Sequence, residues 1–249
     1  MSHTWIAFPK GAFPMGAQRE DPLSASFDLD ATEREAPPHR IDLEAFEMAD
    51  FPVTVREYGA FVVAGGYDDE SLWRAGGFGA HEAPLGWEAQ SRSTDRPVVG
   101  VSWYEATAYA EFVGALLPTE AQWERAARGI VGRRFAFGEE VEGLTHMNSL
   151  EARFGGPSPR GAFPRAVSPE GIYDLSGNIW EWCQCRFGAY DLPVAPGAGE
   201  RLVEDPAAPR VMRGGCFAAR TVYNRAAFRS NARPEHRFDR RGFRLVRER

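Results

Sequence analysis

Apolar residues recur every three or four positions in three segments of the chain, and each segment follows a capping box. In that motif a Ser or Thr hydroxyl accepts the amide of the third helical residue, whose Glu or Gln side chain reaches back. The three boxes start at Thr54, Ser102 and Thr119, so we predict three helices there. We predict that these helices end at glycines, namely Gly65 and Gly66, Gly114, and Gly129. Their predicted buried faces consist of Val55, Tyr58, Phe61 and Val62; Ala106, Tyr109, Phe112 and Val113; and Trp123, Ala126 and Ala127.

The remaining apolar runs are short and are interrupted by glycine and proline. The stretches PVVGVSW (97–103), RVMRGGCF (210–217) and RGFRLV (241–246) have the composition of short strands. Residues 83–96 and 188–209 are predicted to form long irregular loops. No internal repeat or low-complexity linker divides the sequence. We therefore predict a single domain over residues 1–249, of the α+β class and rich in irregular loops.

The composition, with 43% hydrophobic and 26% charged residues, is typical of a soluble globular protein. The sequence has no window of about 18 apolar residues, so we expect no membrane partner. Its first residues, MSHTWIAFPKGAFPMG, show no basic region followed by an apolar run, so we predict no signal peptide. Three cysteines, an odd number, favour reduced thiols over a disulfide framework. Together these features predict a cytoplasmic protein.

The net charge of -6 is divided unevenly along the chain. Residues 210–249 carry 12 arginines against three carboxylates, a local balance of +9, so residues 1–209 carry -15. Such a basic end is one way to bind nucleic acid. However, its arginines alternate with large apolar residues, which a disordered basic tail would lack. We therefore predict that this end folds against the acidic part of the chain through arginine–carboxylate pairs, with Arg213 and Arg244 among them, and that nucleic acid is not a partner.

The stretch GIYDLSGNIWEWC, residues 171–183, places two carboxylates among large apolar side chains. Asp174 opens its polar part, and Glu181 stands between Trp180 and Trp182. A carboxylate between two indoles is not typical of a solvated loop. Because a buried carboxylate needs a compensating partner, either a metal ion or arginine side chains must neutralise this pair.

Six blocks of sequence occur here in a fixed order: PVTVREYGAFVVAGGY, RPVVGVSWYEATAYAEFVG, LPTEAQWERAARG, GIYDLSGNIWEWC, RVMRGGCF and RGFRLVRE. This series, which runs from about Trp5 to Arg247, resembles the sulfatase-modifying-factor family, whose best-known member is the formylglycine-generating enzyme. The resemblance implies a variant of the C-type lectin fold, rich in irregular loops and stabilised by bound calcium. It says less about activity, because a fold does not fix a function.

The resemblance implies a structural calcium ion in the block DLSGNIWE. Its ligands would be the side chains of Asp174 and Glu181 and the carbonyl groups of Gly177 and Ile179. Calcium prefers such a mixture of carboxylate and carbonyl oxygens, which a turn-forming glycine can direct inward. The alternative is that arginines satisfy the two buried carboxylates.

A second calcium site of the family aligns with MNSLEARFG, residues 147–155. The side chain of Asn148 and the carbonyl groups of Ser149 and Phe154 match its ligands. Ala152 stands where the family has an aspartate, so this ligand set is incomplete.

The chemistry of the formylglycine-generating enzyme is predicted to be absent. That enzyme binds copper(I) through two cysteine thiolates, a ligand choice that suits a soft ion. Ala219 replaces the first of them, and no thiol occurs from Phe217 to Arg249. Cys216 alone cannot form the pair, so the sequence argues against copper. The five histidines do not have the spacing of an iron site, and Cys183 and Cys185 are predicted to be small core residues.

Two functions therefore remain open. The first is a ligand- or protein-binding accessory module, which includes the variable receptor proteins of diversity-generating retroelements; those vary the segment that matches residues 216–241. The second is a divergent metal- or thiol-dependent oxidoreductase, with Cys216 as its thiol candidate. For the first, a protein or small-molecule ligand would occupy a groove after RVMRGG, where aromatic and arginine side chains resemble a recognition surface. The predicted groove residues are Cys216, Phe217, Arg220, Tyr223, Asn224, Arg229 and His236.

Overall fold

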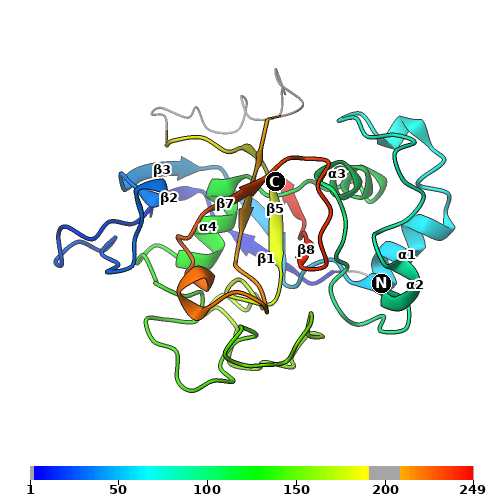
Figure 1. The fold of residues 1–249 in the computed structure, drawn as a ribbon. Coiled ribbons are helices and arrows are strands. Elements are labelled where there is room, and N and C mark those ends of the chain that lie inside the picture. The colour runs from blue at the N-terminus through cyan, green and yellow to red at the C-terminus, as the bar shows by residue number, and fades with distance from the viewer. Residues whose placement is uncertain (1–2, 191–207, 249) are drawn as a thin grey trace.

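The computed structural model describes residues 3–190 and 208–248, and Figure 1 shows its fold. The three predicted helices are confirmed as α1 (Val55–Val63), α3 (Trp103–Phe112) and α4 (Glu120–Arg128). In each of them both hydrogen bonds of the capping box form. No helix in the described ranges is long and apolar enough to cross a membrane.

Eight of the eleven residues predicted for the buried faces of these helices are buried, and Val62 and Val113 are half-buried. Tyr58, Tyr109 and Trp123 are buried, whereas Phe112 is 38% exposed, so its predicted burial is wrong. Phe112 is the last residue of α3, and its ring packs edge-on against Phe61 with a centroid distance of 5.4 Å. One side of the ring is therefore covered while the other faces solvent.

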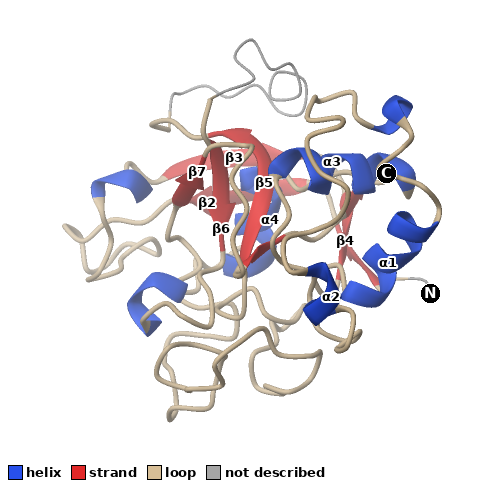
Figure 2. Ribbon diagram, turned by 45° about the vertical axis from the view of Figure 1, so that its right-hand side comes forward, coloured by secondary structure: helices blue, strands red, loops and turns tan. Residues whose placement is uncertain are grey.

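Nine short strands in the described ranges form three sheets (Figure 2). The first is antiparallel and has the order β1 (Trp5–Phe8), β4 (Phe46–Ala49), β9 (Val246–Glu248). The second pairs β2 (Gly11–Met15) with β3 (His39–Leu43). The third has the order β7 (Ser230–Ala232), β6 (Arg210–Arg213), β5 (Trp180–Arg186), β8 (Arg241–Gly242), with β8 parallel to β5. The remaining short helices are α2 (Trp87–Gln90), η1 (Glu33–Glu35), η2 (Glu70–Leu72) and η3 (Thr221–Asn224).

Two of the three predicted strand segments contain strands. Residues 210–217 include β6, and residues 241–246 contain β8 and the first residue of β9. The prediction for 97–103 is wrong, because only Pro97 makes an isolated bridge, to Thr54. Gly100 turns this segment with φ of +71°, and a Cβ there would lie 2.8 Å from the carbonyl oxygen of Leu85. The predicted loop 83–96 contains α2, and most of the predicted loop 188–209 lies outside the described residues.

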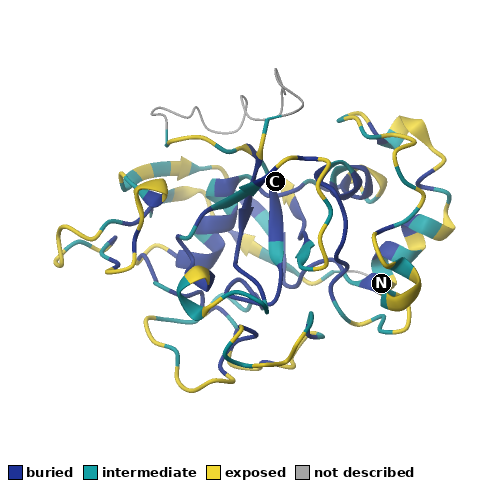
Figure 3. Cartoon of the chain, viewed as in Figure 1, coloured by how far each residue is buried: buried dark blue, intermediate teal, exposed yellow. Residues whose placement is uncertain are grey.

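Strand β5 separates two apolar cores. Trp182 faces the core that α1 and α3 cover, while Cys183 and Cys185 face the core that includes Trp123 of α4. Alternate residues of a strand point to opposite sides, which accounts for this division. Figure 3 shows the burial concentrated around β5, β6 and α4 and the long loops below them exposed.

The C-terminal arginines fold against the acidic part of the chain, as predicted. Arg213 pairs with Glu120 and Glu124 on α4, and Arg225 pairs with Asp28 and Glu35. Each of these arginines is buried. The buried arginines of the last forty residues therefore hold this segment against the acidic part of the chain.

Candidate ligand groove and metal ligands

Arginine, not solvent, surrounds the carboxylate between the two indoles. Arg244 donates from Nε to Oε2 and from Nη2 to Oε1 of Glu181, each at 2.6 Å. Trp123 adds a third hydrogen bond, from Nε1 to Oε2 at 2.8 Å. Glu181 and Arg244 are both fully buried. The arginine alternative thus holds for this residue, and the predicted pairing of Arg244 is confirmed.

Asp174, by contrast, lies in a buried loop in which carboxylates outnumber arginines. Its carboxylate accepts a hydrogen bond from Asn178 Nδ2 at 2.8 Å. Burial raises the pKa of Asp174 to about 7; Asn178 and Arg244 lower it, and Glu181 raises it further. Because Arg244 is already bound to Glu181, the pair of carboxylates keeps an excess negative charge.

The loop that carries the predicted calcium carbonyls is tightly wound. Asp174 and Asn178 both have positive φ, and Gly177 has φ of +90°. A Cβ on Gly177 would lie 2.5 Å from the carbonyl oxygen of Asn148, which accepts the amide of Asn178. Only glycine fits this approach, so the two predicted calcium segments are packed directly against each other.

Asn148 has an acceptor that the protein does not satisfy. Its Nδ2 donates to Gly156 O, Ser158 Oγ and Asn178 Oδ1 at 2.9–3.1 Å. Its Oδ1 is buried and receives no hydrogen bond within the described ranges. An oxygen of this kind suits a hard cation such as calcium. Ser149 beside it is buried, whereas Phe154 has a 43% exposed side chain.

The residues therefore fit calcium in part. The carboxylate of Asp174 is buried beside a second carboxylate, and Oδ1 of Asn148 has no hydrogen-bond donor in the described ranges. Both oxygens of Glu181, in contrast, accept hydrogen bonds from Arg244. No group of three or more His, Cys, Asp or Glu side chains in the described part of the chain is placed to hold a metal ion. Main-chain carbonyl and side-chain amide oxygens would therefore have to complete the coordination shell of each calcium ion, as in the two predicted ligand sets. Both calcium sites stay predictions.

Three of the seven predicted groove residues are buried parts of the protein. Cys216 is 2% exposed, and its amide donates to Asn224 Oδ1 at 3.0 Å. Burial raises the pKa of the Cys216 thiol. Arg229 makes a bidentate pair with Glu120 at 2.6 and 2.8 Å. Cys216, Asn224 and Arg229 thus fix the shape of this segment and do not face a ligand.

The other four predicted groove residues reach the surface but do not converge. Tyr223 is 45% exposed and contacts Phe228 at a centroid distance of 5.2 Å. His236 is exposed near Phe238, and Phe217 is half-buried. Arg220 is exposed and lines a cavity.

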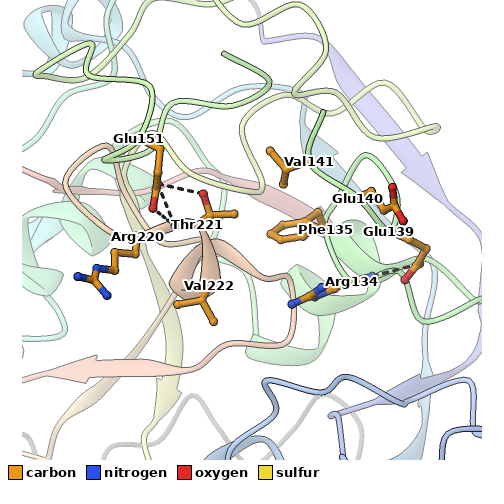
Figure 4. Close-up of a pocket in the computed structure, with 9 residues that line it drawn as sticks. All are labelled: Arg134, Phe135, Glu139, Glu140, Val141, Glu151, Arg220, Thr221 and Val222. Carbon is orange, nitrogen blue, oxygen red and sulfur yellow. Dashed lines mark hydrogen bonds between the residues drawn. The ribbon is translucent and has the colours of Figure 1, made fainter. Parts of the chain in front are cut away.

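That cavity and a neighbouring one form what we call the loop groove. The first has a volume of about 530 Å³ and is lined by Arg134, Phe135, Glu139, Glu140, Val141, Glu151, Arg220, Thr221 and Val222 (Figure 4). The second has a volume of about 350 Å³ and is lined by Val141, Gly143, Leu144, Met147, Ser149, Glu151 and Thr221. Both cavities share Val141, Glu151 and Thr221, so they adjoin.

Glu151 ties the two walls of the loop groove together. The amide of Thr221 donates to both of its oxygens at 3.2 and 3.1 Å, and the Thr221 hydroxyl donates at 2.9 Å (Figure 4). Burial alone would raise the pKa of Glu151, but hydrogen bonds from its own amide, Thr221 and Ser149 lower it overall. The carboxylate therefore stays ionised at neutral pH.

Sequence reasoning did not place the wall formed by residues 134–151 in the groove. It assigned Asn148 and Ser149 of this wall to the second calcium site, and the contact of the wall with η3 joins residues 70 positions apart. One available signal was Glu151, which stands next to Ala152, the position of the missing family aspartate. Of the predicted groove residues, Arg220 lines the loop groove, and its role in ligand binding stays a prediction.

Comparison with known proteins gives consistent relatives. The model of a family described as "Sulfatase-modifying factor enzyme 1-like domain" matches residues 2–249. The formylglycine-generating enzyme of Streptomyces coelicolor is 32% identical over 97% of this chain and 88% of its own length. Hercynine oxygenase of Mycolicibacterium smegmatis is 30% identical over 98% of this chain, which spans only 61% of that protein.

Solved structures show the same fold. PvdO from Pseudomonas aeruginosa superposes with a TM-score of 0.76 at 24% identity, covering 98% of this chain and 94% of that one. Treponema denticola variable protein 1 superposes with a TM-score of 0.63 at 19% identity, covering 99% and 95%. The predicted fold class, α+β of the formylglycine-generating-enzyme type, is confirmed.

Proposed function

The chain belongs to the sulfatase-modifying factor family, and we propose that it uses the family scaffold to bind a ligand in the loop groove, without copper chemistry. The observation that carries this proposal is the pair of adjoining cavities, one wall of which is η3, directly after the RGGC block. Concave sites with apolar walls and a few placed polar groups are the usual ligand sites of proteins. The ligand would be a small molecule or a segment of a partner protein.

The thiol arrangement supports a role without formylglycine generation. Cys216 is buried, its pKa is raised, and Ala219 occupies the family position of the first copper ligand. Copper(I) is held by thiolates, so a protonated single thiol is a poor site. Incubation with copper(I), oxygen and a sulfatase-type cysteine peptide should leave the peptide mass unchanged. Aldehyde formation above a no-enzyme control would contradict this part of the proposal.

A divergent oxidoreductase is the second candidate, because the names of two relatives describe an oxygenase and a formylglycine-generating enzyme. In this case a partner or the ligand itself would complete the set of metal ligands. Metal analysis of anaerobically purified protein, combined with an oxygen-consumption screen, separates the two candidates. Catalytic oxygen uptake that disappears in Cys216→Ser would favour the oxidoreductase.

Calcium is part of the proposal as a structural ion. The excess negative charge at Asp174 and the unsatisfied Oδ1 of Asn148 support it. Asp174, Gly177, Ile179 and Glu181 would hold one ion, with Glu181 sharing its carboxylate between the ion and Arg244. Asn148 would contribute to the second ion.

Two further proposals concern the location of the protein and the variation of its sequence. We place the protein in the cytoplasm. The three free, buried cysteines support this, because reduced thiols are typical of a reducing compartment. Diversification of residues 216–241 would leave sequence variants of this segment among related genes. The likeness to Treponema denticola variable protein 1, at 19% identity, concerns the fold alone.

A cavity-filling variant tests the ligand groove. A thermal-shift screen of small molecules should give ligands that raise the melting temperature of the wild type. Val222→Trp, which fills the larger cavity, should abolish these shifts, whereas Val63→Trp, at an 89% exposed position on α1, should keep them. Ligands that stabilise Val222→Trp as well as the wild type would place binding elsewhere.

A further inference from the structure

The two arginines that line the larger cavity form no ion pair with its carboxylates in the part of the chain that the structure describes. Arg134 is paired with Asp28, at 3.4 Å, and with Asp30. The side chain of Arg220 extends away from Phe135, on the far side of Thr221 (Figure 4). Neither guanidinium therefore neutralises a carboxylate that lines the cavity.

The negative charges, in contrast, remain uncompensated. Glu139 and Glu140 are exposed at one end of the larger cavity, and Glu139 accepts the amide of Arg134, at 3.3 Å. Glu151 is half-buried and is the only carboxylate that lines both cavities. Its partners are amides and hydroxyls, and it has no Lys, Arg or His within ion-pair distance in the ranges that the structure describes. The amide and hydroxyl of Thr221 thus position the Glu151 carboxylate without neutralising its negative charge.

The remaining lining is apolar and firmly supported. Phe135 is buried and stacks on Phe137 with an interplanar angle of 2° and a centroid distance of 5.5 Å. Val141 and Val222 complete the apolar part of the larger cavity, and Leu144 and Met147 line the smaller one. A fixed negative charge thus stands at the junction of two apolar surfaces.

We infer that the loop groove selects a small organic cation with an apolar body, whose ammonium group pairs with Glu151 while its body lies against Phe135, Val141 and Val222. This inference rests on the proposed binding function and names the chemical class of its ligand. Charge complementarity favours a cation, and a half-buried ion pair is screened less by salt than an exposed one.

Three probes of equal shape test the inference on the full-length protein. 2-Phenylethylamine, 2-phenylethanol and 3-phenylpropionate share a phenyl ring on a short chain and differ in the charge of the head group. Titration followed by calorimetry or NMR should show that the amine binds at least tenfold more tightly than the alcohol, and that the acid does not bind. Raising the salt concentration should weaken the amine only.

Glu151→Gln should lower the affinity for the amine to that of the alcohol, because glutamine keeps an acceptor for Thr221 but loses the charge. Glu70→Gln, on η2 outside the groove, is the matched control and should have no effect. Equal affinity for the amine and the alcohol, or no binding of the amine, would overturn the inference. The titrations of the wild type alone measure these affinities, so the test stands even if Glu151→Gln does not fold. Alcohol binding that Val222→Trp abolishes would then leave the groove as a ligand site with a different preference.

Discussion

Replacing Arg244 with methionine should cost more stability than most single substitutions in this protein. The side chain is fully buried and makes two hydrogen bonds of 2.6 Å to Glu181. It also donates to the carbonyl oxygens of Ala49 and Tyr173, at 3.3 and 3.0 Å. Methionine has a similar volume and no charge, so the change removes the charge with little change in packing.

The expected loss follows from what remains behind. Glu181 would stay buried with Trp123 as its remaining donor, and breaking a buried ion pair in this way costs about 3–5 kcal/mol. In a chain of this size, each kcal/mol lowers the melting temperature by roughly 2–4 °C. A loss of about 4 kcal/mol therefore predicts a decrease of roughly 8–16 °C.

The assay is urea and thermal unfolding of the wild type and two variants in the presence of chelator. Arg244→Met should show the full loss, and the double variant Arg244→Met with Glu181→Gln should recover part of it, because glutamine can still accept from Trp123 without a buried charge. If Arg244→Met unfolds within 2 °C of the wild type, the pair does not hold the fold together. If the double variant is less stable than Arg244→Met alone, the uncompensated charge is not the cause.

Three further predictions concern metal, thiol and surface. In chelator, the stability contributed by protonated Asp174 is present below its ordinary pKa of 3.8 and is lost as the pH rises through about 7. The free energy of unfolding, measured by urea titration, should therefore fall by up to about 4 kcal/mol over this range. Saturating calcium or Asp174→Asn should flatten this dependence on pH. Iodoacetamide should alkylate Cys216 only at the rate of global unfolding at pH 8, since the thiol is buried and its pKa is raised; rapid labelling of the native protein would contradict this. Arg220→Ala and Tyr223→Ala should each leave the melting temperature within about 2 °C of the wild type, because both side chains are exposed; a larger decrease would show a structural role.

The helices could be predicted from the sequence because their signals are local. Each capping box joins residues three positions apart, for example Thr54 and Glu57 at 2.8 Å. The failure at 97–103 has the opposite origin. Its apolar residues are buried by loops from distant parts of the chain, with the amide of Val98 bonded to Val53 and that of Gly100 to Phe238. Burial without a neighbouring strand has the same sequence pattern as a buried strand.

The sequence predicted one residue that lines the loop groove, Arg220, and could not distinguish it from the buried residues of the same segment. Glu120 and Arg229, 109 positions apart, form a bidentate pair, and no local pattern distinguishes such an arginine from one that faces a ligand. Asn224 reads as a polar surface residue, yet it is buried against the turn at Gly215. The contact of Glu151 with Thr221, which closes the loop groove, is likewise visible only in the fold.

These same long-range pairs explain how the segment after β6 keeps its shape without a pair of thiolates. Asn224 holds the amide of Cys216, Arg225 binds Asp28 and Glu35, and Arg229 binds Glu120. The three anchors are buried: Asn224 is the last residue of η3, and Arg225 and Arg229 follow it in the chain. The wall of the loop groove is therefore fixed by protein contacts alone, before any ligand arrives. A preorganised wall reduces the entropy that a ligand must overcome, which is what a binding role for this scaffold requires.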